Sequence, residues 1–422
     1  MSIKYIKEKL FCNQVAIERV AKEIGTPLYL YDYHQIVENF KNYQEAFQEI
    51  DPLICYAYKA NSNLSICKTL ALLGSGADVV SDGELFKALK AGVSPEKIIF
   101  NGNGKSEKDL EYAISCNIFM INVDCKNELY LIDKIACNFN KKVNISIRIN
   151  PHINPLTHPY IATGLAKSKF GIDVNSALDV YQEASQLKNI IILGVHAHIG
   201  SQITTAGLLV ENLKKLVKLV EKLSKVNINL SYVNVGGGLG IKYHQEEIPK
   251  IKDISKKIIP ILKKRNLKLI LEPGRSIVGE AGILVSKVLY LKKTPTKKFV
   301  VVDAAMNDLI RPSIYDSYHR IIPLEQKNEQ VLEEVDVVGG ICESGDFLAK
   351  NRNMSPLKRG DYLAILDTGA YGFSMSSNYN SRRRPAEVLV KDKEYFVIRH
   401  RETYEDLVAK EEFLSDGILR SL

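Results

Sequence analysis

The sequence lacks the features that mark membrane proteins and disulfide-stapled proteins. No run of about 18 apolar residues occurs, and residues 1–10 carry charged side chains where a signal peptide would be apolar. The seven cysteines are odd in number and include no CxxC pair, so neither a disulfide framework nor a zinc site is indicated. These absences predict a cytoplasmic protein that does not contact a membrane.

An excess of charge of one sign is also missing. The formal charge of +8 is the difference between 57 basic and 49 acidic residues, and the lysines are scattered along the chain. The one dense basic cluster, Arg382–Arg384, is short. A nucleic-acid surface needs basic residues clustered together with aromatic residues. We therefore expect no nucleic-acid partner.

What the sequence does contain, from about residue 36 to 272, is an alternation of apolar β-branched runs with amphipathic stretches. This pattern is typical of βα units around a parallel sheet. Eight runs are predicted strands: residues 53–58, 77–80, 98–100, 118–122, 143–149, 191–198, 232–235 and 268–271. Eight units predict a TIM-like (β/α)₈ barrel, with a doubly wound open sheet as the alternative.

The pattern changes beyond about Gly279. Charged or glycine-bearing turns separate short runs that predict antiparallel strands at residues 283–292, 298–302, 362–366, 386–390 and 394–398. Residues 26–31 form a further strand-like run ahead of the barrel. We therefore predict a barrel domain over residues 35–278 and a β-rich domain, a small barrel or sandwich, from residues 1–34 and 279–422.

Polar groups follow the predicted barrel strands, where a parallel barrel places its active site. Lys59 follows the first strand, and it is either a surface lysine or a Schiff-base lysine whose pKa burial would depress. His196 and His198 end the sixth strand without a third ligand at plausible spacing, so no metal is predicted. His198 is either a core residue or an aromatic plate for a cofactor ring.

The last two strands are followed by a glycine run and a carboxylate. Gly236–Gly238 form either a flexible loop or a phosphate cradle, which Gly274 would complete. Glu272 either pairs with an arginine or faces a pyridine nitrogen and keeps that ring protonated.

Five short motifs occur in order along the chain: YKANSN at 58–63, HIGSQ at 198–202, GGGLG at 236–240, EPGR at 272–275 and CESGD at 342–346. In this order and spacing they resemble the alanine-racemase-like, fold type III family of pyridoxal-phosphate decarboxylases, in its diaminopimelate decarboxylase branch. The resemblance extends to HPYIATG at 158–164, MNDLIRP at 306–312 and GAYG at 369–372.

The resemblance implies decarboxylation of meso-2,6-diaminopimelate to L-lysine by a homodimer with shared active sites and bound pyridoxal 5′-phosphate. It implies that Lys59 carries the cofactor and that Cys342 of the partner subunit donates a proton. The implied cofactor contacts are Lys59, His198, Ser201, Gly237, Gly238, Glu272, Gly274, Arg275 and Tyr371. The implied substrate contacts are Arg275, Arg311, Tyr315, Glu343 and Tyr371.

Cys342 also has a plain interpretation, because a free cysteine is usually a small buried apolar residue. Its neighbours Glu343 and Asp346 make a core position unfavourable, and acidic neighbours keep a thiol protonated.

Two alternatives to the implied function stay open. One is a decarboxylase of a basic amino acid such as ornithine, arginine or lysine, or of another polyamine precursor, and the other is a non-catalytic homologue that binds the cofactor.

Three positions depart from the family pattern. Ala305 stands where glycine is common, Gly340 where proline is common, and Arg383 where a proline often separates two arginines. None of them removes a chemical group that the implied mechanism needs. They bear on local loop geometry.

Overall fold

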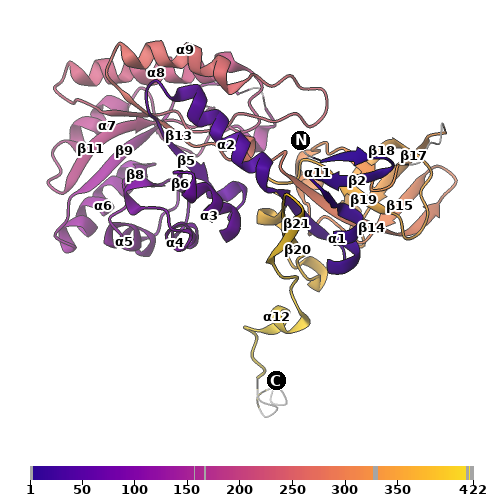
Figure 1. The fold of residues 1–422 in the computed structure, drawn as a ribbon. Helices are drawn as coiled ribbons and strands as arrows, with labels where there is room; N and C mark the ends of the chain where they lie inside the picture. The colour runs from indigo at the N-terminus through magenta and orange to yellow at the C-terminus, as the bar shows by residue number, and fades with distance from the viewer. Residues whose placement is uncertain (1–2, 156, 166–167, 327–330, 415–417, 419–422) are drawn as a thin grey trace.

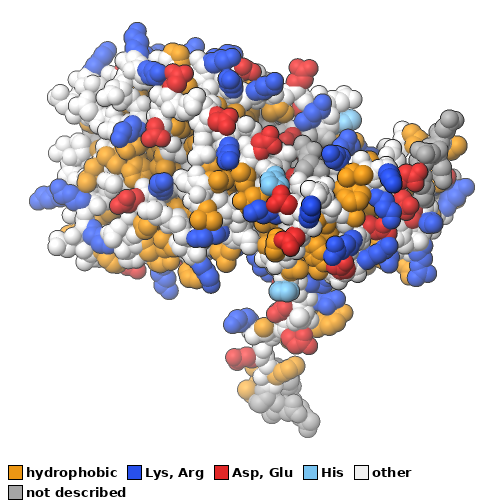
Figure 2. Space-filling model, in the orientation of Figure 1, with side chains coloured by type: hydrophobic (Ala, Val, Ile, Leu, Met, Phe, Trp, Pro, Cys, Tyr) orange, Lys and Arg blue, Asp and Glu red, His pale blue; other side chains and the backbone are white. Residues whose placement is uncertain are grey.

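The computed structural model describes residues 3–155, 157–165, 168–326, 331–414 and 418. Two lobes lie side by side, a helix-covered barrel and a sheet-rich lobe (Figure 1). Lys and Arg side chains alternate with Asp and Glu side chains over the visible face of the molecule (Figure 2). Within the described residues, no helix is long and apolar enough to cross a membrane.

The barrel is a closed parallel sheet. Its strands are β5 (Leu53–Ala57), β6 (Gly76–Val79), β7 (Ile98–Phe100), β8 (Met120–Val123), β9 (Val143–Asn150), β11 (Ile190–His196), β12 (Tyr232–Asn234) and β13 (Lys268–Leu271), with the short β10 (Ile172–Asp173) beside β9. Pairing of β8 with β9 and of β13 with β5 closes the ring. All eight predicted strands are confirmed, and the open sheet is wrong because both edges are paired.

Amphipathic helices cover the outside of the barrel (Figure 1). They are α2 (Tyr33–Phe47), α3 (Leu64–Leu72), α4 (Asp82–Ala91), α5 (Glu107–Ser115), α6 (Lys126–Asn138), α7 (Ala177–Ala184), α8 (Ala206–Ser224) and α9 (Ile251–Lys263). In α4 the Ser81 hydroxyl caps the first turn by accepting from the Glu84 N–H, and Gly92 ends the helix in the left-handed conformation. In α8, Leu209, Leu213 and Leu216 share one buried face at helical spacing.

The second lobe is a nine-stranded sheet. Its strands are β4 (Leu28–Asp32), β14 (Gly282–Lys293), β15 (Lys298–Val302), β16 (Ile321–Pro323), β17 (Glu333–Val338), β18 (Phe347–Met354), β19 (Tyr362–Ile365), β20 (Ala386–Lys391) and β21 (Glu394–Arg399). The prediction of antiparallel pairing is wrong at two places, because β4 pairs with β20 and β15 with β17 in parallel. Strands β16, β17 and β18 were not predicted.

Two smaller pieces complete the chain. At the N-terminus β1 (Ile3–Ile6), β2 (Lys9–Cys12) and β3 (Val15–Ala16) form a three-stranded sheet, followed by α1 (Ile17–Ile24). The short helix α10 (Arg275–Val278) lies between β13 of the barrel and β14 of the second lobe. The short helix α11 (Arg311–Tyr315) lies between β15 and β16 of the second lobe. Helix α12 (Tyr404–Val408) projects away from both lobes (Figure 1).

Candidate active site

Lys59 lies just beyond β5, in a single 3₁₀ turn formed by residues 58–60. Its Nζ is 2.7 Å from Oδ2 of Asp78, a fully buried carboxylate in β6. Burial alone lowers the pKa of Lys59, but the negative charge of Asp78, assisted by Tyr371 and Glu272, outweighs it and raises the pKa. The expectation of a depressed pKa is therefore wrong for Lys59 in this arrangement. The chain holds this lysine as an ammonium.

A network of buried amides joins Asp78 to Glu272. The Asn101 Nδ2 donates to Asp78 Oδ1 at 2.6 Å and to Glu272 Oε1 at 2.7 Å. The Asn122 Nδ2 donates to Asn101 Oδ1 at 2.7 Å, and the Asn234 Nδ2 donates to Glu272 Oε1 at 2.7 Å. These five residues come from the ends of five different strands. Glu272 was predicted from the sequence, whereas the other four were not. For the three asparagines, polar residues at the ends of apolar strands were a usable signal.

Glu272 ends β13 and is buried as an ionised carboxylate. Burial raises its pKa, but the pairing with His196, whose Nε2 is 3.3 Å from Oε2, together with Lys59 and Asn234, lowers it overall. No arginine forms an ion pair with Glu272 within the part of the chain that the structure describes. The interpretation of Glu272 as a simple arginine partner is therefore wrong. A buried anion is available to a cationic ring nitrogen.

His198 and the glycine loop after β12 fix one another. The Gly237 N–H donates to His198 Nδ1 at 3.2 Å, so this nitrogen is an acceptor. Burial, with Lys59 and Arg148, lowers the pKa of His198 well below its ordinary value, and the imidazole is neutral. A side chain at Gly237 would start 2.0 Å from the Glu272 carbonyl oxygen. The loop thus packs directly against the end of β13.

Ser201, Arg275 and Tyr371 lie together beside this loop. The Arg275 Nη2 and Nε donate to Ser201 Oγ at 3.0 and 3.3 Å. The Arg275 guanidinium lies 4.8 Å from the centre of the Tyr371 ring. The Tyr371 N–H donates to the Ala60 carbonyl at 2.8 Å, which brings the second lobe to the residue after Lys59. Tyr371 has a φ of 57°, an uncommon conformation for a tyrosine that functional sites often hold.

Two further glycines of the predicted set have close neighbours. A Cβ at Gly238 would lie 2.3 Å from the Gly200 carbonyl oxygen, and one at Gly274 would lie 3.0 Å from the Ala60 Cβ. Gly238 also has a φ of 103°, which favours glycine. The loops after β11, β12 and β13 therefore meet with little room for side chains.

A second group of residues surrounds Tyr243, a residue that was not predicted from the sequence. The Arg275 Nη1 donates to the Tyr243 hydroxyl at 2.5 Å, and the Arg311 guanidinium lies 4.7 Å from the centre of its ring. Burial lowers the pKa of Arg311. The Tyr315 ring is 5.6 Å from the His158 ring. The structure thus brings Arg275 and Arg311, two of the predicted substrate contacts, to one tyrosine.

Cys342 and Glu343 are exposed on a loop of the second lobe. The Cys342 N–H donates to Asn380 Oδ1 at 3.0 Å. Asp346 anchors the loop, because its two carboxylate oxygens accept from the Met306 and Ile341 N–H groups at 2.7 Å. The interpretation of Cys342 as a buried apolar residue is wrong. No hydrogen bond or ion pair between described residues joins Cys342 or Glu343 to Lys59.

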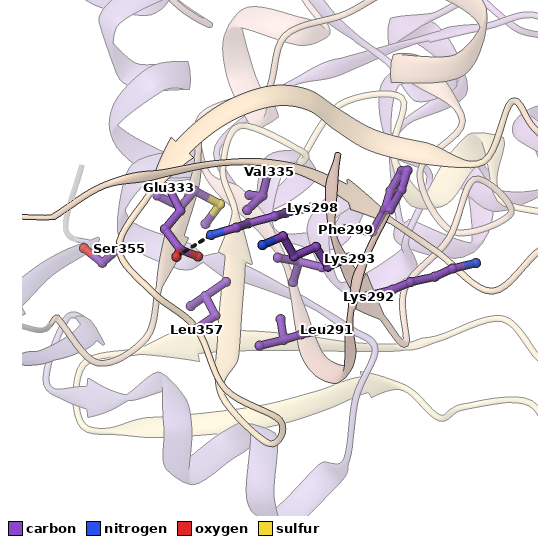
Figure 3. A pocket seen from close by; sticks show the side chains of 11 residues that line it. Leu291, Lys292, Lys293, Lys298, Phe299, Glu333, Val335, Ser355 and Leu357 are labelled. Carbon is purple, nitrogen blue, oxygen red and sulfur yellow. Dashed lines mark hydrogen bonds and ion pairs between the residues drawn. The ribbon is translucent and has the colours of Figure 1, made fainter. Parts of the chain in front are cut away.

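A different cavity, of about 190 Å³, lies in the second lobe among β14, β15, β17 and β18 (Figure 3). Its walls include Leu291, Phe299 and Val335, and Lys298 Nζ lies 2.5 Å from Glu333 Oε1 at its edge. It contains none of the predicted site residues. Across the described ranges, no group of three His, Cys, Asp or Glu side chains could hold a metal ion.

The chain resembles known proteins over almost its whole length. Residues 33–279 match the family described as pyridoxal-dependent decarboxylase, pyridoxal binding domain. The diaminopimelate decarboxylase of Aquifex aeolicus is 48% identical over 96% of each chain. The crystal structure of the Helicobacter pylori enzyme with L-lysine has a TM-score of 0.90 and 45% identity, covering 94% of this chain and 99% of that one.

A second solved structure agrees. Diaminopimelate decarboxylase from Methanocaldococcus jannaschii, in complex with L-lysine, has a TM-score of 0.93 and 43% identity, covering 98% of both chains. The family match spans more than half of the chain, and the relatives match it nearly end to end. This chain therefore belongs to the pyridoxal-dependent decarboxylase family, in its diaminopimelate decarboxylase branch.

Proposed function

We propose that this chain is a pyridoxal-5′-phosphate-dependent carboxy-lyase that converts meso-2,6-diaminopimelate to L-lysine and carbon dioxide, the last step of lysine biosynthesis. The observation that carries the proposal is the group at the end of the barrel, in which Lys59 faces the buried Asp78 and an amide network links both to an ionised Glu272. The names of the relatives, and the L-lysine bound in two of the similar structures, support it.

The residues present fit pyridoxal phosphate. Lys59 supplies an amine, Glu272 a buried negative charge and His198 a flat neutral ring. Ser201, Gly237, Gly238, Gly274, Arg275 and Tyr371 are the proposed neighbours of the phosphate. When bound, the cofactor supplies an electron sink for the electron pair released as the Cα–carboxylate bond breaks.

The protein groups hold and move protons around that step. Asp78 Oδ2 accepts a hydrogen bond from the Lys59 ammonium. This contact favours a proton on Nζ whenever the amine is not bonded to the cofactor. Glu272 stays ionised and would favour a proton on the ring nitrogen of the bound cofactor. We assign the proton donor for the substrate carbon to the thiol of Cys342 of the partner subunit.

The distal end of the substrate decides between candidate amino acids. Diaminopimelate presents a second carboxylate there, whereas ornithine, lysine and arginine present a cation. Arg275 and Arg311 beside Tyr243 form a pair of guanidinium groups, which favours a carboxylate. We place Tyr315 and Tyr371 near this carboxylate and Glu343 near the distal amine. A non-catalytic homologue is disfavoured, because Lys59 and Cys342 are both present.

We further propose a homodimer with shared active sites, because Cys342 is exposed and needs a second copy to meet a Lys59. We also propose that the barrel domain spans residues 35–278 and that the enzyme acts in the cytoplasm. All seven cysteines lie within the described residues and form no disulfide, which suits a reducing compartment.

The test is release of carbon dioxide by the purified protein with added pyridoxal phosphate. We expect turnover of meso-diaminopimelate, and none of ornithine, lysine or arginine. The matched control is Lys59→Ala, which removes the amine and should abolish turnover. Release of carbon dioxide from ornithine or arginine but not from meso-diaminopimelate would contradict the substrate assignment. Full turnover by Lys59→Ala would contradict the role of the lysine.

A further inference from the structure

We infer that His319 is a positioning residue that orients Arg311 toward the distal carboxylate of the substrate, and that it thereby helps to determine which amino acids bind. The inference rests on the proposed function, because it assumes that Arg311 receives that carboxylate.

Two of the three guanidinium nitrogens of Arg311 have hydrogen-bond partners. Its Nη1 lies 2.7 Å from His319 Nε2, and its Nη2 donates to Ser317 Oγ at 3.2 Å. The flat face of the group lies over the Tyr243 ring. Nε is buried and has no hydrogen-bond partner within the described part of the chain. Arg311 is only 4% exposed, so this donor needs an acceptor that a ligand can bring.

The hydrogen bonds of His319 decide which of its nitrogens accepts. Its Nδ1 lies 2.8 Å from the Leu366 carbonyl oxygen, which can only accept, so Nδ1 carries the proton. Nε2 then has a free lone pair and accepts from Arg311 Nη1. His319 is fully buried, and burial together with Arg311 and Arg275 lowers its pKa well below the ordinary value. The ring stays neutral, as an acceptor for a guanidinium must.

Tyr243 holds the two arginines and His319 in one cluster. Its hydroxyl accepts from Arg275, and its ring makes an edge contact with the His319 ring at 5.2 Å. Arg275 and Arg311 both contact Tyr243, and burial together with the like charge of Arg275 lowers the pKa of Arg311. An anion placed between them relieves this repulsion, whereas a cation adds to it. The cluster therefore selects for carboxylate.

The chemistry of the reaction provides a probe for this end of the site. Decarboxylation removes one carboxylate of diaminopimelate, and L-lysine keeps the other. Cadaverine is the same diamine without any carboxylate. L-lysine and cadaverine therefore differ by the group that Arg311 receives, and their inhibition constants measure that contact separately from the rest of the site.

The experiment compares His319→Phe with His319→Gln in the enzyme loaded with pyridoxal phosphate. Phenylalanine keeps a flat ring against Tyr243 and removes the acceptor, whereas the glutamine side chain offers an oxygen for Arg311. For His319→Phe we expect KM for meso-diaminopimelate and Ki for L-lysine to rise by roughly tenfold or more, the effect of one lost charge-assisted hydrogen bond. We expect kcat and Ki for cadaverine to stay within about twofold, since neither depends on that hydrogen bond. His319→Gln should recover most of the L-lysine affinity.

Equal weakening of L-lysine and cadaverine, or unchanged L-lysine affinity in His319→Phe, would overturn the inference. If His319→Phe does not fold, His319→Gln decides, because loss of its preference for L-lysine over cadaverine would overturn the inference and retention would support it. A wild-type protein that does not decarboxylate meso-diaminopimelate would instead overturn the proposed function. The two failures are distinguishable, because inhibitor binding is read from the absorbance of the bound cofactor without turnover.

Discussion

The end of the barrel around Lys59 and the loop around Cys342 differ in how completely one chain builds them. Lys59 faces a fully buried aspartate and sits in a hydrogen-bonded network that draws on several strands. Cys342 is exposed, and its backbone N–H donates to the side chain of Asn380. The first region is complete within one copy. The second presents a reactive group outward.

This difference indicates that the two regions have different roles in the proposed enzyme. Burial and fixed amides set the charges of Asp78 and Glu272 near the cofactor site. The proposed proton donor is needed only after the carboxylate has left. An exposed loop of a second subunit can supply it without disturbing the buried network.

The greatest loss of activity is expected when Lys59 or Cys342 is replaced. Lys59→Ala and Cys342→Ala should each be inactive alone, because each removes one half of every site. Mixed under conditions that exchange subunits, they should recover about one quarter of wild-type activity, because half of the dimers are mixed and each of these has one intact site. The measurement is carbon dioxide release after mixing. No recovery despite demonstrated exchange would mean that Cys342 acts in its own subunit.

A smaller loss of activity is expected from Glu272→Gln, a change within the buried network. The amide keeps the size of the side chain and can still accept from Asn234, but it carries no charge. We expect kcat to fall by about 10²–10³, the usual loss for one preorganised electrostatic contact. Steady-state kinetics measures the loss, and the spectrum of the bound cofactor checks that the site is still loaded. A kcat close to wild type would show that the charge is not needed.

The smallest effect is expected at the exposed pair Lys298–Glu333, which borders the cavity of Figure 3. Both side chains are more than a third exposed, so solvent screens their attraction. Lys298→Met should change the free energy of unfolding by less than about 1 kcal/mol and leave turnover unchanged. Urea unfolding followed by circular dichroism measures the first quantity. A marked loss of turnover would assign this cavity a role in the reaction.

Local patterns were sufficient to predict the barrel. Each of its strands is a short apolar run that a helix-like stretch follows, so periodicity alone locates it. Strands β17 and β18 carry charged residues such as Glu333, Glu334 and Lys350, which hide their strand character. The parallel pairing of β4 with β20 could not be predicted, because it joins segments more than 350 residues apart.

The same holds for the site: residues that follow predicted strands could be predicted, and residues placed by tertiary contacts could not. Lys59 and Glu272 could be predicted because each follows a strand. Asp78 sits inside a predicted strand, where polar residues carry no obvious meaning, and the charge that it imposes on Lys59 depends on a contact between two strands. His319 and Tyr243 belong to separate connections, and only the folded chain brings them to Arg311. Their part in the site arises from tertiary packing.

The central place of β4 in the second sheet has a consequence for synthesis of the chain on the ribosome. Residues 28–32 pair with 282–285 on one side and with 386–390 on the other. The barrel strands, residues 53–271, leave the ribosome between the first of these segments and the last two. The barrel can therefore close while β4 still waits for both of its neighbours. Assembly of the second lobe comes last, and until then an apolar strand has two unpaired edges.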